Sequence, residues 1–435
     1  MLRSDFRNSI NYALCFMKKN AVSKDKYILL FILILGLVLR LIPAFYTPIV
    51  GDTSHWQRTG ASIFAGKNPY QLKQKILFPY PPLWMIFEGS AYWLSRTLNL
   101  PFGFIIKLPL ICSDLGIAVL LFYLVSGTVK QKLLGVLVFI LNPISILITS
   151  FHGQFDTLPI FFICIALLFF RGKKTLLSAF SLGLGIALKT FPVLLLPFFL
   201  FSIPGGWKKK LNSLIISLAP IILLLMPFLI LDYSSVQESF FNYSGWTDHG
   251  WMSIIRAGYW LSHNFIYQPT RFLDQLLLVN KLVFLGFWTV CIWKFRHTET
   301  NLCLQIASVF LAFFLIYGGI SSQYLVWPLV FLILSDSILS FYYSIFAGFA
   351  LLGYYSFFLP RLFFWMIPFW TITAEKEALI KKPILENAGL ITTDPLGLAI
   401  KSVLIFHLFT QIIWWFFLSV ILFKYLFPRL LHSNN

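Results

Sequence analysis

Long apolar runs separated by short basic clusters constrain this chain more than any other feature. The first run extends from Tyr27 to Tyr46, and similar runs recur as far as about Phe423. Roughly 20 apolar residues cross a hydrocarbon core as a helix, and backbone groups in lipid must be hydrogen-bonded internally. With 58% hydrophobic residues, 11% charged residues and a mean hydropathy of +0.81, the composition lies outside that of soluble domains. We therefore predict an all-α, polytopic transmembrane helix bundle of about 12 spans.

The basic clusters predict how the bundle is oriented. The net charge is +18, but the basic residues gather between apolar runs, which is the pattern that sets membrane topology and not one that indicates nucleic-acid binding. Residues 1–26 carry Lys18, Lys19, Lys24 and Lys26, so we place this segment in the cytoplasm and interpret the run behind it as a retained span. The five cysteines show no CxxC spacing and indicate small core residues.

Alternation of apolar and basic segments then predicts two regions, a transmembrane core over residues 27–335 and a C-terminal transmembrane segment over residues 336–435. Polar segments fall outside the membrane at residues 47–101, 150–157, 232–280, 321–324 and 360–401. Within the first of these, the apolar stretch from Leu83 to Leu94 is too short to cross confidently, and a true span is the alternative. We therefore expect interfacial helices in the first external loop.

Asp52 lies in the first polar loop after an apolar run, in a chain with only 16 acidic residues. His55 and Arg58 follow at i+3 and i+6, so on a helical turn Asp52 and His55 share a face and can address one ligand. The structural alternative is a solvated helix cap, a role that aspartate favours. Asp52 is nevertheless the first candidate for chemistry, because external loops gather polar residues that a bundle has no structural reason to collect on one side.

Four further ionisable residues lie in or beside apolar stretches. His152 and Asp156 are spaced i, i+4, which fits a metal pair or a hydrogen-bonding clamp, although two ligands do not make a metal site. Lys189 lies where two short apolar runs meet, and there a cation either meets an anionic head group or snorkels to the interface. Asp114 is costly inside a membrane, and its structural interpretation is a pair with Lys107 or a polar backbone group.

Several short motifs in this order resemble the glycosyltransferase C superfamily. The nearest relatives are the polyprenyl-phosphate-mannose-dependent mannosyltransferases of GPI-anchor and phosphatidylinositol-mannoside type and their prokaryotic homologues, and the dolichyl-phosphate-glucose glucosyltransferases share some elements. The motifs are Gly51-Asp52 with His55-Trp56, Gly66-Lys67-Asn68-Pro69-Tyr70, Tyr80-Pro81-Pro82-Leu83, Asp114-Leu115, Asn142-Pro143, His152-Gly153-Gln154-Phe155-Asp156, Leu188-Lys189-Thr190-Phe191-Pro192 and Gln323-Tyr324-Leu325. They cover residues 28 to 335.

The resemblance implies transfer of a hexose, with mannose expected first, from a polyprenyl-phosphate donor to a lipid or glycan acceptor hydroxyl. Transfer would take place on the external or lumenal face, with inversion, and the acid of the first external loop would be the base, which gives that role to Asp52. Where the family often has a charged His-Glu-Arg string, this chain has Ser321-Ser322-Gln323-Tyr324. The residues expected to bind substrate are His55, Arg58, Tyr80, His152, Gln154, Asp156, Lys189, Gln323 and Tyr324.

The chemistry of the donor requires little more than these groups. A general base must lie within hydrogen-bond reach of the hydroxyl that it deprotonates, and a polyprenyl phosphate is already a good leaving group. Cationic and hydrogen-bonding residues, for which Lys189, His152 and Gln154 are the candidates, need only stabilise its charge. We therefore expect no cofactor, although a divalent metal remains compatible with the sequence.

Two other classes of function remain open at this stage. A transporter or flippase of lipid-linked sugars would place Asp114, Asp156 and Lys189 along a path near the midplane of the membrane. A non-catalytic membrane subunit would leave Asp52 far from Asp156 and Lys189. The chain shows no internal repeat of the kind common in secondary transporters. We expect a multi-pass protein of the plasma membrane in a prokaryote or of the endoplasmic reticulum in a eukaryote, with membrane lipids and no nucleic acid among its partners.

Overall fold

The computed structural model describes residues 24–47, 52–72, 78–241, 247–262, 270–295, 302–358 and 395–426. These residues form α-helices, short 3₁₀ and π-helical turns, and an isolated β-bridge between His249 and Ile320. The all-α prediction is therefore confirmed. The segment predicted as an external loop at residues 360–401 lies mostly outside the described residues, although its last part belongs to a helix that begins at Pro395.

Seven apolar helices in the described part of the chain are long enough to cross a membrane. Each coincides with an apolar run of the sequence, although α6 reaches the required length only by continuing into the turns that follow it. They are α2 (Lys24–Tyr46), α5 (Phe102–Leu124), α6 (Val129–Ile140), α11 (Trp207–Val236), α13 (Thr270–Phe295), α16 (Ser337–Phe358) and α19 (Pro395–Ile421).

Shorter apolar helices fill the space between these long ones. They are α8 (Thr157–Arg171), α9 (Thr175–Leu188), α10 (Leu196–Ser202) with the 3₁₀ turn η3 (Phe191–Leu195), α14 (Leu302–Ile316), and α15 (Trp327–Ser335) with the 3₁₀ turn η5 (Ser322–Val326). The remaining elements are α3 (Asp52–Phe64), η1 (Pro69–Gln71), α4 (Pro82–Leu98), α7 (Pro143–Ser145), η2 (Ile146–His152), η4 (Gln237–Phe241), α12 (Gly250–Ser262) and η6 (Leu422–Leu426).

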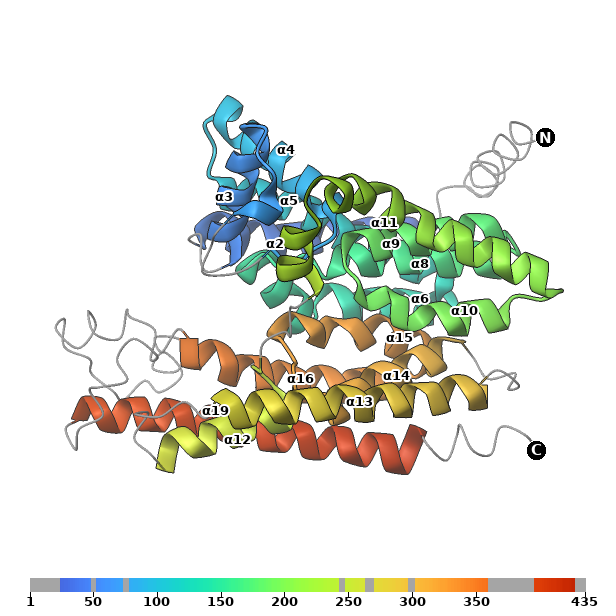
Figure 1. Cartoon of the computed structure of the whole chain (residues 1–435). Helices are drawn as coiled ribbons and strands as arrows, with labels where there is room; N and C mark the ends of the chain where they lie inside the picture. Colours follow the sequence, from blue (N-terminus) through green and yellow to red (C-terminus); the bar gives the residue numbers. More distant parts are fainter. Residues whose placement is uncertain are drawn as a thin grey trace.

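The helices form two layers in chain order (Figure 1). One layer holds α2 to α11, and the other holds α12 to α19. The layers meet where α15 packs against α6, where α16 packs against α7, and where η5 lies beside η2. One large apolar cluster runs through both layers, with Ile140, Phe310 and Phe331 fully buried. The seam between the layers is therefore tightly packed along much of its length.

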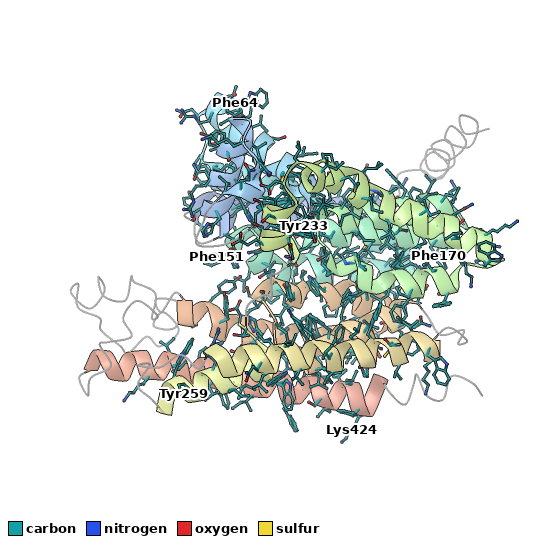
Figure 2. The ribbon with its side chains drawn as sticks, viewed as in Figure 1. Phe64, Phe151, Phe170, Tyr233, Tyr259 and Lys424 are labelled. Carbon is teal, nitrogen blue, oxygen red and sulfur yellow. The ribbon has the colours of Figure 1, made fainter. Side chains whose placement is uncertain are left out.

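Helices α3 and α4 pack against each other at one end of the first layer (Figure 1). Neither is among the described helices with the length and hydropathy of a span, which agrees with the predicted interfacial pair. Figure 2 shows Phe151 and Tyr259 toward this same end, and Phe170 and Lys424 toward the opposite end. The alternation of polar loops and basic clusters along the sequence therefore corresponds to two ends of the bundle.

The chain is least regular where it approaches the polar loops. Asn142 and Pro143 interrupt the run predicted from Leu133 to Thr149, because the Asn142 side chain accepts from the backbone N–H of Ile144 and starts the short helix α7. The chain continues as the π-helix η2, an arrangement that is frequent at functional sites. The segment predicted as a loop at residues 232–280 contains α12 and the start of α13, so part of it is amphipathic helix instead.

Candidate active site

Asp52 begins helix α3, and its side chain turns toward the loop that follows η2. Its carboxylate accepts a hydrogen bond from Nε2 of Gln154 and lies 3.8 Å from Nε2 of His152. The Asp52 side chain is 30% exposed, whereas Gln154 is fully buried. The structure therefore brings Asp52, His152 and Gln154 together from segments about a hundred residues apart, and leaves the carboxylate accessible.

The backbone at Gly153 sets the direction of this loop. Gly153 ends η2 with a φ of +86°, a conformation that glycine adopts without steric cost. A Cβ atom here would lie 2.9 Å from Cε of Lys107 and 3.0 Å from Cγ2 of Thr53. Because the helix ends at Gly153, the helical i, i+4 relation between His152 and Asp156 does not hold, and neither the predicted metal pair nor the predicted clamp forms between them. Instead His152 and Gln154 face Asp52, and Nδ1 of His152 lies 3.0 Å from the Tyr355 hydroxyl.

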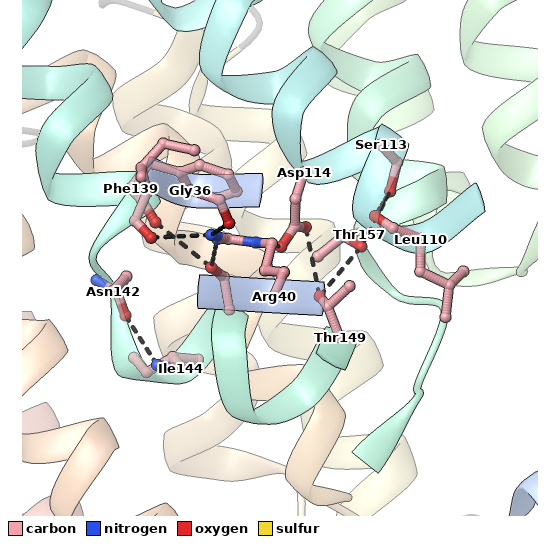
Figure 3. Close-up of polar contacts among 12 residues, drawn as sticks. Gly36, Arg40, Leu110, Ser113, Asp114, Phe139, Asn142, Ile144, Thr149 and Thr157 are labelled. Atoms are coloured by element: carbon pink, nitrogen blue, oxygen red, sulfur yellow. Dashed lines mark hydrogen bonds and ion pairs between the residues drawn. The ribbon is translucent and has the colours of Figure 1, made fainter. Parts of the chain in front are cut away.

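A buried ion pair holds both ends of this loop (Figure 3). Nε of Arg40 donates to Asp114 at 2.7 Å, and both side chains are fully buried. Asp114 also accepts from Thr149, which precedes the loop, and Thr149 lies 3.5 Å from the hydroxyl of Thr157, which follows it. Arg40 additionally donates to Ser145, at the start of η2. The pairing of Asp114 with Lys107 that the sequence suggested is wrong. Asp114 pairs with Arg40 on α2, and the Lys107 ammonium donates to other groups.

Lys107 supports the loop from the other side. Its ammonium donates to Oγ1 of Thr47 at 2.6 Å and to the carbonyl oxygen of Phe151 at 3.0 Å. The side chain is only 2% exposed, and no carboxylate lies within ion-pair distance of it among the described residues. The Lys107 ammonium therefore lies against the backbone just before His152. The sequence did not predict this contribution.

Lys189 and Asp156 form a second buried ion pair beside the loop. Nζ of Lys189 donates to Asp156 at 2.7 Å, and the indole N–H of Trp327 donates to the other carboxylate oxygen at 2.7 Å. The ammonium also lies between 4.9 and 5.6 Å from the ring centres of Phe155, Tyr80 and Tyr324, within cation–π range. The structure thus gathers four residues predicted for substrate binding (Tyr80, Asp156, Lys189 and Tyr324) around one charge. That charge is already neutralised by Asp156.

The other predicted residues lie at different depths. Gln323 is buried in η5, and its Oε1 accepts from the hydroxyl of Ser322 at 3.4 Å. Arg58 is exposed and donates to Nδ1 of His55 at 2.7 Å, on the same face of α3. His55 and Arg58 therefore contact each other, and the expectation that Asp52 and His55 address one ligand stays a prediction.

Asp248 is a further acid at this site that sequence analysis missed. Its side chain is nearly buried just before α12, with the Arg256 guanidinium 3.9 Å away. Burial raises the pKa of Asp248 to about 6; Arg256 opposes the rise and the nearby Asp52 carboxylate adds to it. The only sequence signal was an acid in an external segment rich in Trp, His and Tyr, which does not distinguish it from a surface residue.

Clustered metal ligands are absent from the described ranges. No group of three or more His, Cys, Asp or Glu side chains in them is placed to hold a metal ion. The carboxylates Asp114 and Asp156 are each engaged by a basic side chain.

Comparison with known proteins identifies the class of this membrane protein. The chain matches the model of glycosyltransferase family 87 over residues 78–317, more than half of its length. It is 25% identical over 288 residues to GPI mannosyltransferase 1 of Kluyveromyces lactis, covering 61% of this chain and 66% of the yeast protein, just under two thirds. Its fold is similar to the crystal structure of ArnT from Cupriavidus metallidurans bound to undecaprenyl phosphate, with a TM-score of 0.50, 13% identity, and 92% and 77% of the two chains covered.

The fold and these matches define an integral-membrane glycosyltransferase of the GT-C type. The chain belongs to glycosyltransferase family 87. The resemblance inferred from the short motifs is thereby confirmed at the level of the superfamily and of a mannosyltransferase-like protein.

Proposed function

We propose that this protein transfers a hexose, mannose first among the candidates, from a polyprenyl-phosphate sugar to a hydroxyl of a lipid or glycan acceptor. The observation that carries the proposal is the Asp52 carboxylate, which is partly exposed and is oriented by Gln154 and His152. The likeness to the yeast mannosyltransferase supports mannose, and the solved relative with a bound polyprenyl phosphate supports the class of donor.

In the proposed reaction, the acceptor oxygen attacks the anomeric carbon from the face opposite the phosphate. Asp52 takes the hydroxyl proton while the new C–O bond forms, and the bond from the anomeric carbon to the phosphate oxygen breaks, so the configuration inverts. The electron pair leaves with the polyprenyl phosphate. Gln154 donates to Asp52 and so directs the free lone pairs of the carboxylate toward the acceptor.

The positive charges near the site are unequal candidates for stabilising the departing phosphate. Lys189 is paired with Asp156, so together they are close to neutral. The Lys107 ammonium donates to the carbonyl oxygen of Phe151 and has no carboxylate partner among the described residues. We propose that Lys107 supplies the electrostatic stabilisation, that His152 contributes a hydrogen bond, and that Lys189 mainly orders the aromatic residues around it.

The two alternative classes receive less support. A transport path requires charged groups that are free to meet a substrate within the membrane, yet Arg40 with Asp114 and Lys189 with Asp156 are closely paired. A non-catalytic subunit would leave the predicted residues dispersed, whereas one loop links Asp52, through Gln154, to Asp156 and Lys189. A site at one end of the bundle fits transfer at a single membrane face.

Asp52→Asn tests the proposed base, with Glu238→Gln, at an exposed acid, as the control. Membranes with equal amounts of each protein are given radiolabelled polyprenyl-phosphate mannose or glucose. The expected result is a fall in product formation by about 10²- to 10⁴-fold for Asp52→Asn, with the control near the parent. Parent-like activity of Asp52→Asn would remove Asp52 from this role.

A further inference from the structure

The seam between the two layers carries buried polar atoms that have no hydrogen-bond partner within the described part of the chain. Oε1 of Gln154, Oγ of Ser321 and Nε of Arg256 belong to this group. Native proteins satisfy nearly all buried polar groups, so an unsatisfied one requires a specific explanation. Here an acceptor, a hydroxyl and a donor come from segments of both layers, which no packing requirement explains.

Contacts across the seam place these atoms around Asp52. His152 reaches Tyr355 of the second layer at 3.0 Å. The Tyr355 and Tyr354 hydroxyls lie within hydrogen-bonding reach of Ser322, which follows Ser321. The backbone N–H of Asp248 donates to the carbonyl oxygen of Ile320 at 3.0 Å, next to Ser321, and the Asp52 carboxylate adds to the rise in the pKa of Asp248. The polar chain therefore runs from the base across the seam to Asp248.

Asp248 and Arg256 form a loose pair. The charged atoms are 3.9 Å apart, longer than a direct hydrogen bond, while another nitrogen of Arg256 donates to Thr247 at 2.9 Å. The guanidinium also lies 4.9 Å from the ring centre of Trp260. Arg256 is thus held on two sides, and its Nε has no hydrogen-bond partner among the described residues.

Buried polar atoms without partners cost free energy, and a structural role does not require them. The combination of acidic, basic and hydroxyl groups at this seam decides which ligand the site can bind. A phosphate beside Arg256 would also meet the Asp248 carboxylate, which repels it, whereas sugar hydroxyls both donate and accept. We propose that Asp248, Arg256 and Ser321 form the subsite that holds the hydroxyls of a sugar ring opposite Asp52. This inference rests on the proposed transferase function and adds to it the residues that recognise the sugar.

The sugar can belong either to the donor or to a glycosylated acceptor, and binding measurements separate the two. Purified full-length protein in lipid nanodiscs is titrated with polyprenyl-phosphate mannose and with polyprenyl phosphate. A second arm compares a mannosylated lipid with the same lipid lacking mannose, in the presence of saturating polyprenyl phosphate. The variants are Asp248→Asn, which is nearly isosteric, and Ser321→Ala, which removes a single hydroxyl; Glu238→Gln, at an exposed acid, is the matched control.

The parent is expected to prefer the sugar-bearing ligand in one arm. Asp248→Asn is expected to reduce that preference by about tenfold or more and Ser321→Ala by a few-fold, with binding of polyprenyl phosphate unchanged. In transfer assays, Asp248→Asn should raise KM more than it lowers kcat, whereas Asp52→Asn should lower kcat. Parent-like preference in both folded variants, or equal losses for ligands with and without sugar, would overturn the proposal.

These outcomes keep this inference separate from the proposed function. Transfer by the parent, with unchanged sugar preference in Asp248→Asn and Ser321→Ala, would remove the subsite and leave the transferase intact. A sugar preference that depends on Asp248, in a protein without transfer activity, would retain the subsite and remove the transferase. A parent that binds the carrier without any preference for sugar in either arm would overturn the subsite directly.

Discussion

Nδ1 of His152 lies 3.0 Å from the hydroxyl of Tyr355, 203 residues further along the chain. The contact joins the end of η2 in the first layer to α16 in the second. His152 in turn lies beside Asp52, so the second layer helps to fix the geometry around the proposed base. A site that spans both layers explains why residues from distant parts of the sequence contribute to it.

Tyr355→Phe should therefore weaken catalysis more than stability. The substitution keeps the ring contact with Phe151 and removes only the hydroxyl that holds His152. A lost hydrogen bond of this kind costs about 1 kcal/mol, and a misplaced catalytic group can lower kcat by about tenfold. Initial rates and thermal unfolding in detergent measure both effects. A kcat equal to that of the parent would show that His152 does not depend on this contact.

The sequence predicted the helical class, the apolar segments and the polar loops, because hydropathy and charge act locally along the chain. Asp52 and the loop from His152 to Asp156 were identified for the same reason, since each is a polar interruption beside an apolar run. Gly153 shows where this reasoning fails. The spacing of His152 and Asp156 implied one helical face, but the helix ends between them and they turn toward different partners.

Pairings between distant segments could not be predicted in this way. Arg40 lies in the middle of an apolar run, and nothing in its neighbourhood indicates Asp114 as its partner 74 residues later. Asp248 likewise becomes notable only when α12 brings it to the Asp52 side of the seam. Such contacts depend on how the helices pack, which a single sequence reports only weakly.

Removing either Lys189 or Asp156 alone should destabilise the protein far more than removing both. Asp156→Asn leaves an ammonium buried without its counter-charge, and Lys189→Met leaves a buried carboxylate, so each should destabilise the protein by about 3–5 kcal/mol. The double variant removes both charges, and the Trp327 indole can still donate to the amide oxygen at position 156. Its stability should therefore recover most of the loss.

Unfolding of the two single variants and the double variant in the same detergent tests this coupling. Additive losses in the double variant would contradict the pairing. Transfer activity adds a second readout: a stable double variant with normal transfer activity would assign the pair to structure alone, whereas a stable but inactive one would assign Lys189 or Asp156 to substrate binding.

Arg40→Lys should destabilise the protein although it retains the positive charge. Arg40 donates to Asp114 and Ser145 and to the carbonyl oxygens of Gly36 and Ile140, and a lysine ammonium cannot reproduce this planar set. The expected cost is about 2 kcal/mol. The protein that remains folded should show an unchanged KM, because Arg40 is buried beneath the loop and touches no substrate. A wild-type unfolding temperature would contradict the role assigned to this guanidinium.

Glu88 should make stability depend on pH. It is fully buried in α4, neither carboxyl oxygen has a hydrogen-bond partner among the residues that the structure describes, and the nearby Trp84 indole offsets burial only in part. Burial raises the pKa of Glu88 well above its ordinary value of 4.5, so the folded state keeps a proton that the unfolded state releases. Stability should then fall as the pH rises above about 4.5, by about 1.4 kcal/mol for each unit of pKa difference, until the folded carboxyl also ionises.

Glu88→Gln removes this titration and should flatten the dependence of stability on pH between 5 and 8, whereas Glu238→Gln, at an exposed position, should retain the slope of the parent. Thermal unfolding of the three proteins across that range measures the difference. A buried carboxyl without partners avoids the cost of its charge only by staying protonated, and this is why the slopes should differ. Identical slopes in all three proteins would contradict the prediction, because Glu88 would then ionise in the folded protein as readily as in the unfolded chain.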